Sequence, residues 1–370
     1  MSTTVNPATS AVVHEHVKVT RRSRASLVGA AIGVPVLVVL GFLPYLVDRG
    51  TQQSLVLLFS LIVMGTMWNL LAGYGGMVSI GQQAFIGTGA YGLAVVADLF
   101  GVHPFLAVPV SVAVAGVVAW LSSFLVFRLA GGYFAIGTWV LAEVFKLVTV
   151  QIPQLGGGSG LTLRAYSGMG PGLRIASVYW LSLMAAVAAI AVTYGIMRTR
   201  LGLGFTAIRD DTVAASSLGV RVSISKRIVY VVSAMGCALA GAMIASSTLN
   251  VQPESIFNVQ YSAFMLFIVV IGGIGTIEGP IIGAILFFAL QQWLGDLGSW
   301  YLVVLGIIAI AVVLLLPQGL WGLISGNGRL RLFPVGYTLV DTKPRFLDLI
   351  RVDFPRHDNG DGTTNQEEKP

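Results

Sequence analysis

Charged residues are scarce in this chain, since Asp, Glu, Lys and Arg make up only 10% of its 370 residues. A typical soluble domain contains about 25%. So few charged side chains cannot cover the surface of a soluble protein of this length, and hydrophobic residues account for 55% of the chain. The composition therefore excludes an ordinary soluble protein and predicts a chain that is largely embedded in a membrane.

Residues that carry catalysis or metal binding are also few. The single cysteine, Cys237, lies in an apolar run, so we expect a packing residue and no disulfide. The four histidines fall in the predicted tails and one short turn, so we expect no metal or haem site and no cofactor. No G-x-x-x-x-G-K-[ST] segment is present. We therefore expect that the chain is neither an ATPase nor another enzyme.

Apolar segments long enough to cross about 30 Å of hydrocarbon fill most of the sequence. They lie at residues 26–47, 53–72, 79–100, 105–127, 132–149, 177–197, 228–248, 260–275, 280–294 and 299–316. We predict an all-α fold, a polytopic transmembrane helix bundle of about ten spans with helices interrupted by Gly and Pro. An N-terminal tail (1–25) and a C-terminal tail (326–370, with 356–370 disordered) flank the transmembrane domain (26–325).

The basic residues predict the orientation in the membrane. The net charge is +6, and Lys and Arg gather in the 198–227 loop and after the last predicted span, whereas the loops 250–259 and 295–298 have none. Cytoplasmic loops carry an excess of Lys and Arg. We therefore expect both termini and the 198–227 loop to be cytoplasmic. The Gly-rich 150–176 segment would be extracytoplasmic, either as a connector or as a contact surface for a partner.

Two glycine-rich interruptions, at residues 73–92 and 272–280, carry most of the candidate transport residues. Irregular backbone survives in a bilayer only when it is buried in protein or faces water. The glycines therefore indicate either broken helices along a substrate pathway or close helix packing, for example at Gly89 and Gly283. The candidate pathway residues are Ser79, Gln82, Gln83, Thr88, Tyr91, Thr138, Glu143 and Glu278.

Ionisable residues at membrane depth are functional candidates because they are costly in hydrocarbon. They are Asp98, Glu143, Lys146 and Glu278. Glu143 and Lys146 are three residues apart on one predicted helix and can pair with each other, so local pairing is the alternative to a transport role. No span carries the series of carboxylates or histidines that a proton relay requires, which weakens the case for a proton-coupled carrier.

The basic loop at 198–227 predicts a short helix with an apolar face. Asp210 or Asp211 can cap its start, and Gly219 can end it in the left-handed conformation, with Val220 closing back on Ala215. The residues of the predicted face are Val213, Ala214, Ser217 and Leu218. A small apolar face among charged residues suits docking into a groove on a partner protein. The alternative is a solvated connection on the membrane surface.

Five segments together resemble a known family. They are NLLAGYGGMVSIG (69–81), AFIGTGAY (84–91), YFAIGT (133–138), RDDTVAASSLG (209–219) and GGIGTIEGP (272–280). In these segments the chain resembles the inner-membrane permeases of ABC importers for branched-chain amino acids, in particular the M-type (LivM-like) subunit. The resemblance covers roughly residues 30–325 and does not include the tail beyond about Phe333.

The resemblance implies a role for the cytoplasmic loop and a set of partners. The 211–220 segment looks like the coupling helix that receives the ATPase movement, through Asp211, Val213, Ala214, Ser217, Leu218 and Gly219. The chain departs from the family at Thr212 and Ser216, where acidic residues are common. The implied partners are a paralogous permease that forms a heterodimer, two cytoplasmic ATPase subunits and an extracytoplasmic substrate-binding protein. The implied location is the bacterial plasma (inner) membrane.

These features predict the permease subunit of an ATP-driven importer that moves branched-chain or related amino acids by alternating access. Within the same family, urea and short amides are alternative substrates. An ATPase-independent secondary carrier or channel is the alternative from another class, and its intramembrane acids Asp98 and Glu143 would then respond to an ion gradient. A membrane enzyme subunit has little support, because no catalytic constellation is visible.

Overall fold

The computed structural model describes residues 18–20, 24–295, 298, 300–316, 318–325, 332–333 and 338–340. The chain divides into two units, one formed by Met1–Ser23 with Gly336–Pro370 and the other by Arg24–Val335. In the first unit, β1 (Lys18–Thr20) pairs antiparallel with β4 (Thr338–Val340). The predicted disordered segment at 356–370 lies outside the described residues, and the predicted boundaries of the tails stay predictions.

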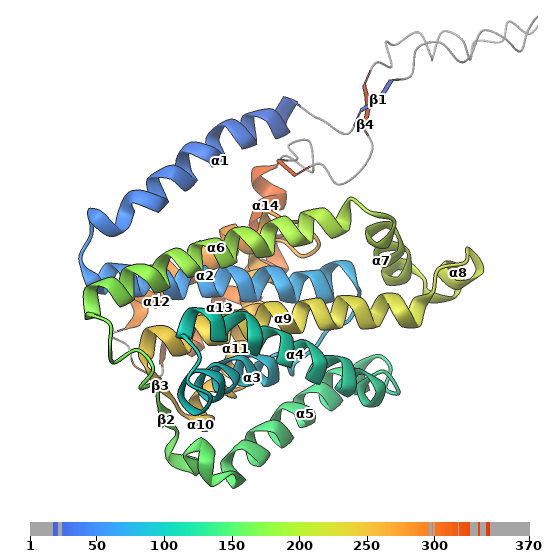
Figure 1. The fold of residues 1–370 in the computed structure, drawn as a ribbon. Helices are drawn as coiled ribbons and strands as arrows, with labels where there is room; N and C mark the ends of the chain where they lie inside the picture. The colour runs from blue at the N-terminus through green and yellow to red at the C-terminus, as the bar shows by residue number, and fades with distance from the viewer. Residues whose placement is uncertain are drawn as a thin grey trace, which may run out of the picture. The chain divides into compact units, whose positions relative to one another are not determined.

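The second unit is a bundle of α-helices (Figure 1). Its first half contains α1 (Arg24–Phe42), η2 (Leu43–Tyr45), α2 (Arg49–Asn69), η3 (Leu70–Tyr74), α3 (Gln83–Ala94), η4 (Val95–Leu99), α4 (Pro104–Val126), α5 (Gly132–Gln151), η5 (Pro153–Leu155), η6 (Gly157–Ser159) and β2 (Leu161–Thr162). Its second half contains α6 (Pro171–Met197), α7 (Arg200–Asp210), α8 (Thr212–Ser217), α9 (Val222–Thr248), β3 (Asn250–Val251), α10 (Pro253–Ile256), α11 (Gln260–Gly272), α12 (Gly279–Leu294), α13 (Trp300–Leu315) and α14 (Gly319–Ile324).

Six helical segments among the described residues have the length and composition to cross a membrane: Arg49–Tyr74, Pro104–Val126, Gly132–Gln151, Pro171–Met197, Val222–Thr248 and Pro253–Gly272. Three more apolar helices are shorter, at Gly33–Tyr45, Gly279–Leu294 and Leu302–Leu315. Each of the ten predicted spans overlaps a helix, the third being α3 with η4. The predicted all-α, polytopic bundle is confirmed, and the count of ten crossings stays a prediction.

The segment formed by α2 and η3 lies at the centre of the bundle. Its most apolar window is 83% buried within the chain, whereas the corresponding windows of α4, α5 and α6 are 33%, 22% and 39% buried. It packs against α6, α9, α11 and α12 (Figure 1). The Ser233 hydroxyl of α9 donates to the carbonyl of Met67, at 2.8 Å, which fixes α9 against the C-terminal part of α2.

Small residues bring the central helices into backbone contact. A Cβ atom at Gly89 of α3 would lie 2.0 Å from the carbonyl oxygen of Ala238 in α9, and one at Gly283 would lie 1.9 Å from that of Ile268. No side chain fits at such distances, so glycine is required at both positions. The close helix packing that the sequence indicated for Gly89 and Gly283 is therefore present, as is usual where helices associate in lipid.

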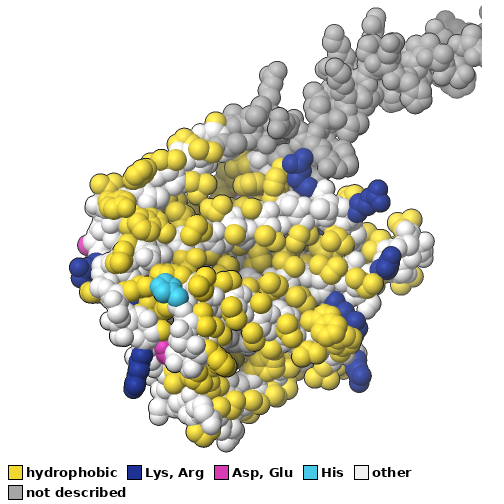
Figure 2. Space-filling view, viewed as in Figure 1, with side chains coloured by type: hydrophobic (Ala, Val, Ile, Leu, Met, Phe, Trp, Pro, Cys, Tyr) yellow, Lys and Arg dark blue, Asp and Glu magenta, His cyan; other side chains and the backbone are white. Residues whose placement is uncertain are grey.

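The two ends of the helix bundle differ from its sides. Figure 1 shows α7 and α8 at one end and β2, β3 and α10 at the other. Hydrophobic side chains cover the side visible in Figure 2, and Lys and Arg side chains gather towards the ends. At the β2–β3 end, Asp98 accepts hydrogen bonds from the backbone of Arg164 and Ala165, and Tyr166 donates to Ser246. These bonds hold the 150–176 segment against η4 and α9.

Candidate functional site

The short helix α8 begins and ends at the residues that the sequence indicates. Asp211 caps its start, because one carboxylate oxygen accepts hydrogen bonds from the N–H groups of Val213 (2.7 Å) and Ala214 (3.0 Å). The N–H groups of Ala214 and Val213 hold the pKa of this carboxyl below its usual value. After the helix, Gly219 has a φ of +82°, and the N–H of Val220 donates to the carbonyl of Ala215 at 3.1 Å.

The capped helix presents an apolar face to solvent. Val213 is 74% exposed and Leu218 is 81% exposed, and Ala214 and Ser217 beside them are also exposed. Ala215, on the other side, is buried and holds α8 against the bundle. The four predicted face residues therefore form one exposed surface, which we call the α8 face. An exposed apolar face on a rigid, capped helix can dock into a groove of another protein.

Arg209, at the end of α7, connects this region to the first glycine-rich interruption. Its Nη1 donates to the carbonyl oxygen of Gly73 at 3.1 Å. Its Nε and Nη2 each lie 3.0 Å from Oδ1 of Asp210. Gly76, with a φ of +68°, lies so close that an added Cβ would be 3.1 Å from the Cα of Arg209. The end of α7 therefore rests directly on the loop that follows η3.

The two glycine-rich interruptions meet each other through Asn69, the last residue of α2. Its Nδ2 donates to the carbonyl oxygen of Thr276 at 2.7 Å, and its Oδ1 accepts from the N–H of Gly275 at 2.8 Å. The 73–92 and 272–280 segments are thus held together by one buried amide. Segments that are about 200 residues apart in the sequence form a single irregular region at the α7–α8 end of the bundle.

Several predicted pathway residues surround the start of α3. The carbonyl of Ser79 accepts from the indole N–H of Trp68 at 2.8 Å, and the hydroxyl of Thr138 accepts from the N–H of Ile80 at 3.2 Å. The Gln83 amide oxygen accepts from the hydroxyl of Ser262 in α11. These contacts join α2, α3, α5 and α11 around the beginning of α3.

Gln82 differs from its neighbours at this helix start. It is fully buried, and neither its amide oxygen nor its amide nitrogen has a hydrogen-bond partner within the part of the chain that the structure describes. A buried amide without partners costs free energy. Gln82 therefore carries unused hydrogen-bonding capacity in the interior, which keeps it a candidate pathway residue.

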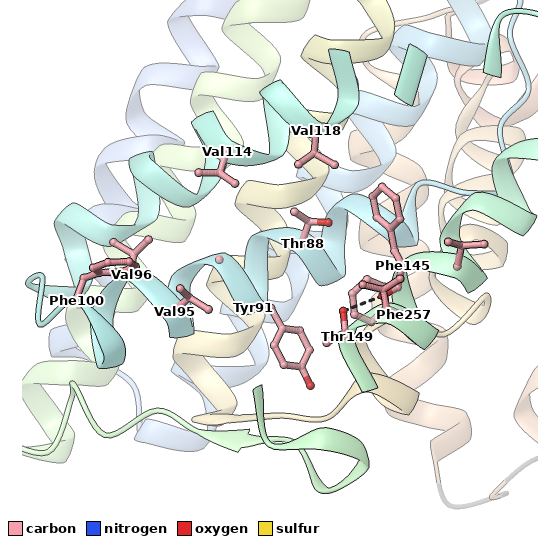
Figure 3. Close-up of a pocket in the computed structure, with 13 residues that line it drawn as sticks. Thr88, Tyr91, Val95, Val96, Phe100, Val114, Val118, Phe145, Thr149 and Phe257 are labelled. Carbon is pink, nitrogen blue, oxygen red and sulfur yellow. Dashed lines mark hydrogen bonds between the residues drawn. The ribbon is translucent and has the colours of Figure 1, made fainter. Parts of the chain in front are cut away.

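Thr88 and Tyr91 line a different place, an apolar pocket between α3, α4 and α5 of about 500 Å³ (Figure 3). Val95, Val114 and Phe145 line it as well. The hydroxyls of Thr88 and Tyr91 donate to backbone carbonyls, those of Ala84 and Val251. The described lining offers no charged group for an ammonium or a carboxylate, so this pocket by itself fits an apolar group.

The predicted acidic candidates each have partners within the chain. Glu143 is half-exposed and pairs with Lys146 at 2.6 Å, and Lys146 also lies 3.5 Å from Glu254 of α10. Glu278 is only 7% exposed, and its Oε1 accepts from the N–H groups of Leu332 (3.0 Å) and Phe333 (2.9 Å). Local pairing therefore describes Glu143, whereas Glu278 is bonded to backbone N–H groups 54 and 55 residues further along the chain.

The predicted pathway residues do not form one site. Ser79, Gln82, Gln83 and Thr138 gather at the start of α3, whereas Thr88 and Tyr91 line the apolar pocket. Glu143 and Glu278 are bonded to other partners and belong to neither group, so the assignment of these residues to a pathway stays a prediction. Among the described residues there is no group of three or more His, Cys, Asp or Glu side chains placed to hold a metal ion.

Sequence reasoning missed the two residues that connect the irregular segments. Arg209 counted there as one of the basic residues that set the orientation and as the first residue of the 209–219 motif, and Asn69 counted as the first residue of the 69–81 motif. No local signal marked either residue, because the partners of Asn69, Gly275 and Thr276, belong to the second glycine-rich segment, and the partner of Arg209, Gly73, is 136 residues away.

Comparisons with known proteins place the α8 face and both glycine-rich segments inside a single family. Residues 50–313 match the model of the family described as "Branched-chain amino acid transport system / permease component". The chain belongs to this permease family. The predicted resemblance is thereby confirmed, and the chain is a multi-pass membrane component of a transport system. The matched range contains α8, Arg209 and Asn69, whereas α1, α14 and the C-terminal segment lie outside it.

Two curated relatives within the permease family cover most of the chain. One is the high-affinity branched-chain amino acid transport system permease protein LivM of Escherichia coli (strain K12), which is 28% identical over 75% of this chain and 71% of its own length. The other is the protein of the same name from Salmonella typhimurium (strain LT2), 27% identical over the same shares. No solved structure matches the chain.

Proposed function

We propose that this chain is the transmembrane permease subunit of an ATP-driven importer that translocates branched-chain or chemically related amino acids. The observation that carries the proposal is the α8 face: an exposed apolar surface on a capped helix, held outside the spans of a permease-family chain. The named relatives belong to a high-affinity branched-chain amino acid transport system, which supports this substrate class.

The chain works with other polypeptides. A paralogous permease forms a heterodimer with it, two cytoplasmic ATPase subunits supply the energy, and an extracytoplasmic binding protein delivers the substrate. The absence of a phosphate-binding loop in the sequence supports this division of labour. The subunit resides in the bacterial plasma (inner) membrane with both termini in the cytoplasm, which the basic residues of the 198–227 loop support.

Transport proceeds by alternating access. When ATP closes the ATPase subunits, the α8 face moves with the ATPase groove in which it lies. The surrounding spans then reorient, and the substrate path opens to the other side. Asp211 and Gly219 contribute by fixing the two ends of α8, so that Val213, Ala214, Ser217 and Leu218 move as one rigid surface.

The experiment that tests the proposal isolates the assembly through an affinity tag on this chain and identifies the co-purifying proteins. The assembly is then reconstituted in liposomes with its binding protein, and uptake of labelled leucine and labelled urea is measured with and without internal ATP. We expect an ATPase and a second permease to co-purify, and leucine uptake to require ATP.

Two outcomes would overturn the proposal. Uptake by liposomes that hold only this chain, driven by an ion gradient and abolished in Glu143→Gln or Asp98→Asn, would establish a secondary carrier. ATP-dependent uptake of urea without uptake of leucine would overturn the proposed substrate class, and the chain would then be the permease of a urea importer. A matched assembly with Val213→Asp and Leu218→Asp serves as the uncoupled control in both measurements.

A further inference from the structure

The central span α2 ends in an unusual way. Its last turn, η3, is a π-helix, in which the backbone hydrogen bonds reach one residue further than in an α-helix. The following N–H groups, those of Gly75, Gly76 and Met77, donate to the carbonyls of Leu70, Ala72 and Leu71. The carbonyl of Gly73 has none of these donors. The Arg209 guanidinium from α7 donates to it instead, at 3.1 Å.

This contact places a positive charge at the C-terminal end of the most buried span. Free carbonyls at a helix C-terminus carry partial negative charge and favour a cation. The guanidinium is also held in position, because Asp210 accepts from Nε and lies 3.0 Å from Nη2, which leaves Nη1 for Gly73. Gly76 allows the backbone of Arg209 to approach within contact distance, although the Arg209 side chain is itself 40% exposed.

On the other side of the same helix end, the second glycine-rich segment is attached. Asn69 bonds both Gly275 and Thr276, and the hydroxyl of Thr276 accepts from the N–H of Gly279, the first residue of α12, at 3.0 Å. The connection from α7 to α12 therefore runs through Arg209, the end of α2, Asn69 and Thr276. The contacts from Arg209 to Gly73, from Asn69 to Gly275 and Thr276, and from Gly279 to Thr276 are hydrogen bonds of partly buried groups, and Gly73 is joined to Asn69 along the backbone of η3.

We infer that Arg209 is the positioning residue that transmits the movement of α8 to both glycine-rich segments, and through them to α2 and α12. This inference rests on the proposed function, in which α8 receives the movement of an ATPase. Arg209 lies two residues before the Asp211 cap, so the start of α8 and the guanidinium belong to one short stretch of chain. The two segments that would receive the movement are rich in glycine. Their backbone can therefore change conformation more easily than the backbone of the regular helices.

The test measures ATP hydrolysis and ATP-driven leucine uptake in the same reconstituted assembly. In Arg209→Ala we expect uptake to fall roughly tenfold, as for the loss of a charge-assisted hydrogen bond, while ATP hydrolysis stays within about twofold. The ATP used per substrate therefore rises. Arg200→Ala is the matched control: Arg200 lies exposed at the start of α7, and no hydrogen bond or ion pair of its side chain occurs among the described residues.

A second variant covers the case in which Arg209→Ala does not assemble. Asp210 is exposed, so Asp210→Ala should fold, and it releases the guanidinium without removing it. We expect a smaller rise in ATP used per substrate in this variant. An unchanged ratio in Asp210→Ala together with an unchanged ratio, or failed assembly, in Arg209→Ala would overturn the inference.

Amide hydrogen exchange distinguishes a role of Arg209 in transmitting the movement from a role in stabilising the fold alone. Amide exchange in 73–81 and 272–280 is compared with and without bound nucleotide. In the unmodified assembly we expect nucleotide to change the exchange of both segments, and in Arg209→Ala we expect no such change. A nucleotide-dependent change that persists in Arg209→Ala would contradict the inference. If the unmodified assembly shows no ATP-driven uptake, the proposed function has failed instead.

Discussion

The helices α4 and α8 both expose large apolar side chains, and the cause differs between them. On α4 the exposed side chains recur every three or four residues, and the opposite face buries small residues: the exposed set includes Leu106, Val110, Val114, Val117 and Leu121, and the buried set Ala107, Ser111, Ala115 and Ala119. This is the pattern of a span whose large side chains meet lipid while its small face packs against α3 and α9.

On α8 the same kind of exposure cannot come from lipid along a span. The helix has six residues, whereas a crossing needs about 20. It also lies in the basic loop, where the flanking arginines favour water. The comparison shows that the exposed apolar surface of α8 needs an explanation other than a spanning helix in lipid, and the proposed ATPase contact supplies one.

The largest effect is expected from substitutions confined to the α8 face. Replacing Val213 and Leu218 with Asp should abolish uptake, because two carboxylates would be desolvated in an apolar groove, while the amount of inserted protein stays unchanged. The measurement is labelled leucine uptake, with protein quantified in the membrane fraction. Thr212→Asp is the control, since at about 100° per residue it lies opposite the α8 face. Normal uptake by the double variant would remove the coupling role of α8.

On α4 a charged substitution is expected to reduce insertion into the membrane and to leave the binding of the ATPase subunits unchanged. Val117 is 58% exposed near the middle of this span, and Asp at the centre of a spanning helix costs about 2.5–3.5 kcal/mol on insertion scales. Val117→Asp should therefore lower the amount of folded protein in the membrane. Any molecules that insert should still hold the ATPase subunits. Unchanged insertion of this variant would mean that the exposed face of α4 meets water or protein.

A smaller effect is expected from the cap of α8. Asp211→Ala should weaken ATPase binding roughly fivefold by loosening the start of the helix, and Asp211→Asn should retain most of it, since Asn also caps. Because the pKa of Asp211 is lowered in the folded chain, the capping contribution is present above the ordinary value of 3.8 and is lost as the pH falls through the lowered value. Titration of the ATPase subunit against both variants at neutral pH measures the difference. Equal affinities would leave the cap without a role in docking.

The smallest effect is expected at Glu143. Glu143 lies within the α5 span, where a neutral amide costs less free energy than a carboxylate, so Gln at this position should not destabilise the span. Lys146 also keeps Glu254 as a partner. Glu143→Gln should therefore leave ATP-driven uptake within about twofold of the unmodified protein. A large loss of uptake, with the amount of protein unchanged, would show that Glu143 takes part in transport.

Much of the fold could be predicted from the sequence, because hydropathy and the caps of α8 are local. Ten apolar segments predicted the helices, and Asp211 and Gly219 predicted both ends of α8. The depth of each helix in the bundle could not be predicted in this way. The most apolar windows of α2 and α4 have the same mean hydropathy, 2.1, yet one is 83% buried and the other 33%. Lipid and protein interior are equally apolar, so hydropathy does not separate them.

The long-range polar contacts could not be predicted from the sequence either. Asn69 bonds residues about 206 positions away, and Arg209 bonds Gly73 across 136 positions. Most of the predicted pathway residues were chosen because they are polar and lie near glycines, and Glu143 because it is ionisable at membrane depth; the first criterion is local. That criterion found Gln82, whose buried amide has no partner in the described part of the chain, but it also selected Thr88 and Tyr91, whose hydroxyls are already bonded to backbone.

The contact of Glu278 with the backbone of Leu332 and Phe333 has a practical consequence for work on this protein. A carboxylate inside the family-matched region holds a segment that lies beyond it. Shortening the chain after Ile324 would leave the buried carboxyl group of Glu278 without these two N–H donors, beside the segment that Asn69 joins to α2. Affinity tags, fusions and truncations at the C-terminal end should therefore begin after Phe333, so that a loss of activity is not caused by the cloning boundary.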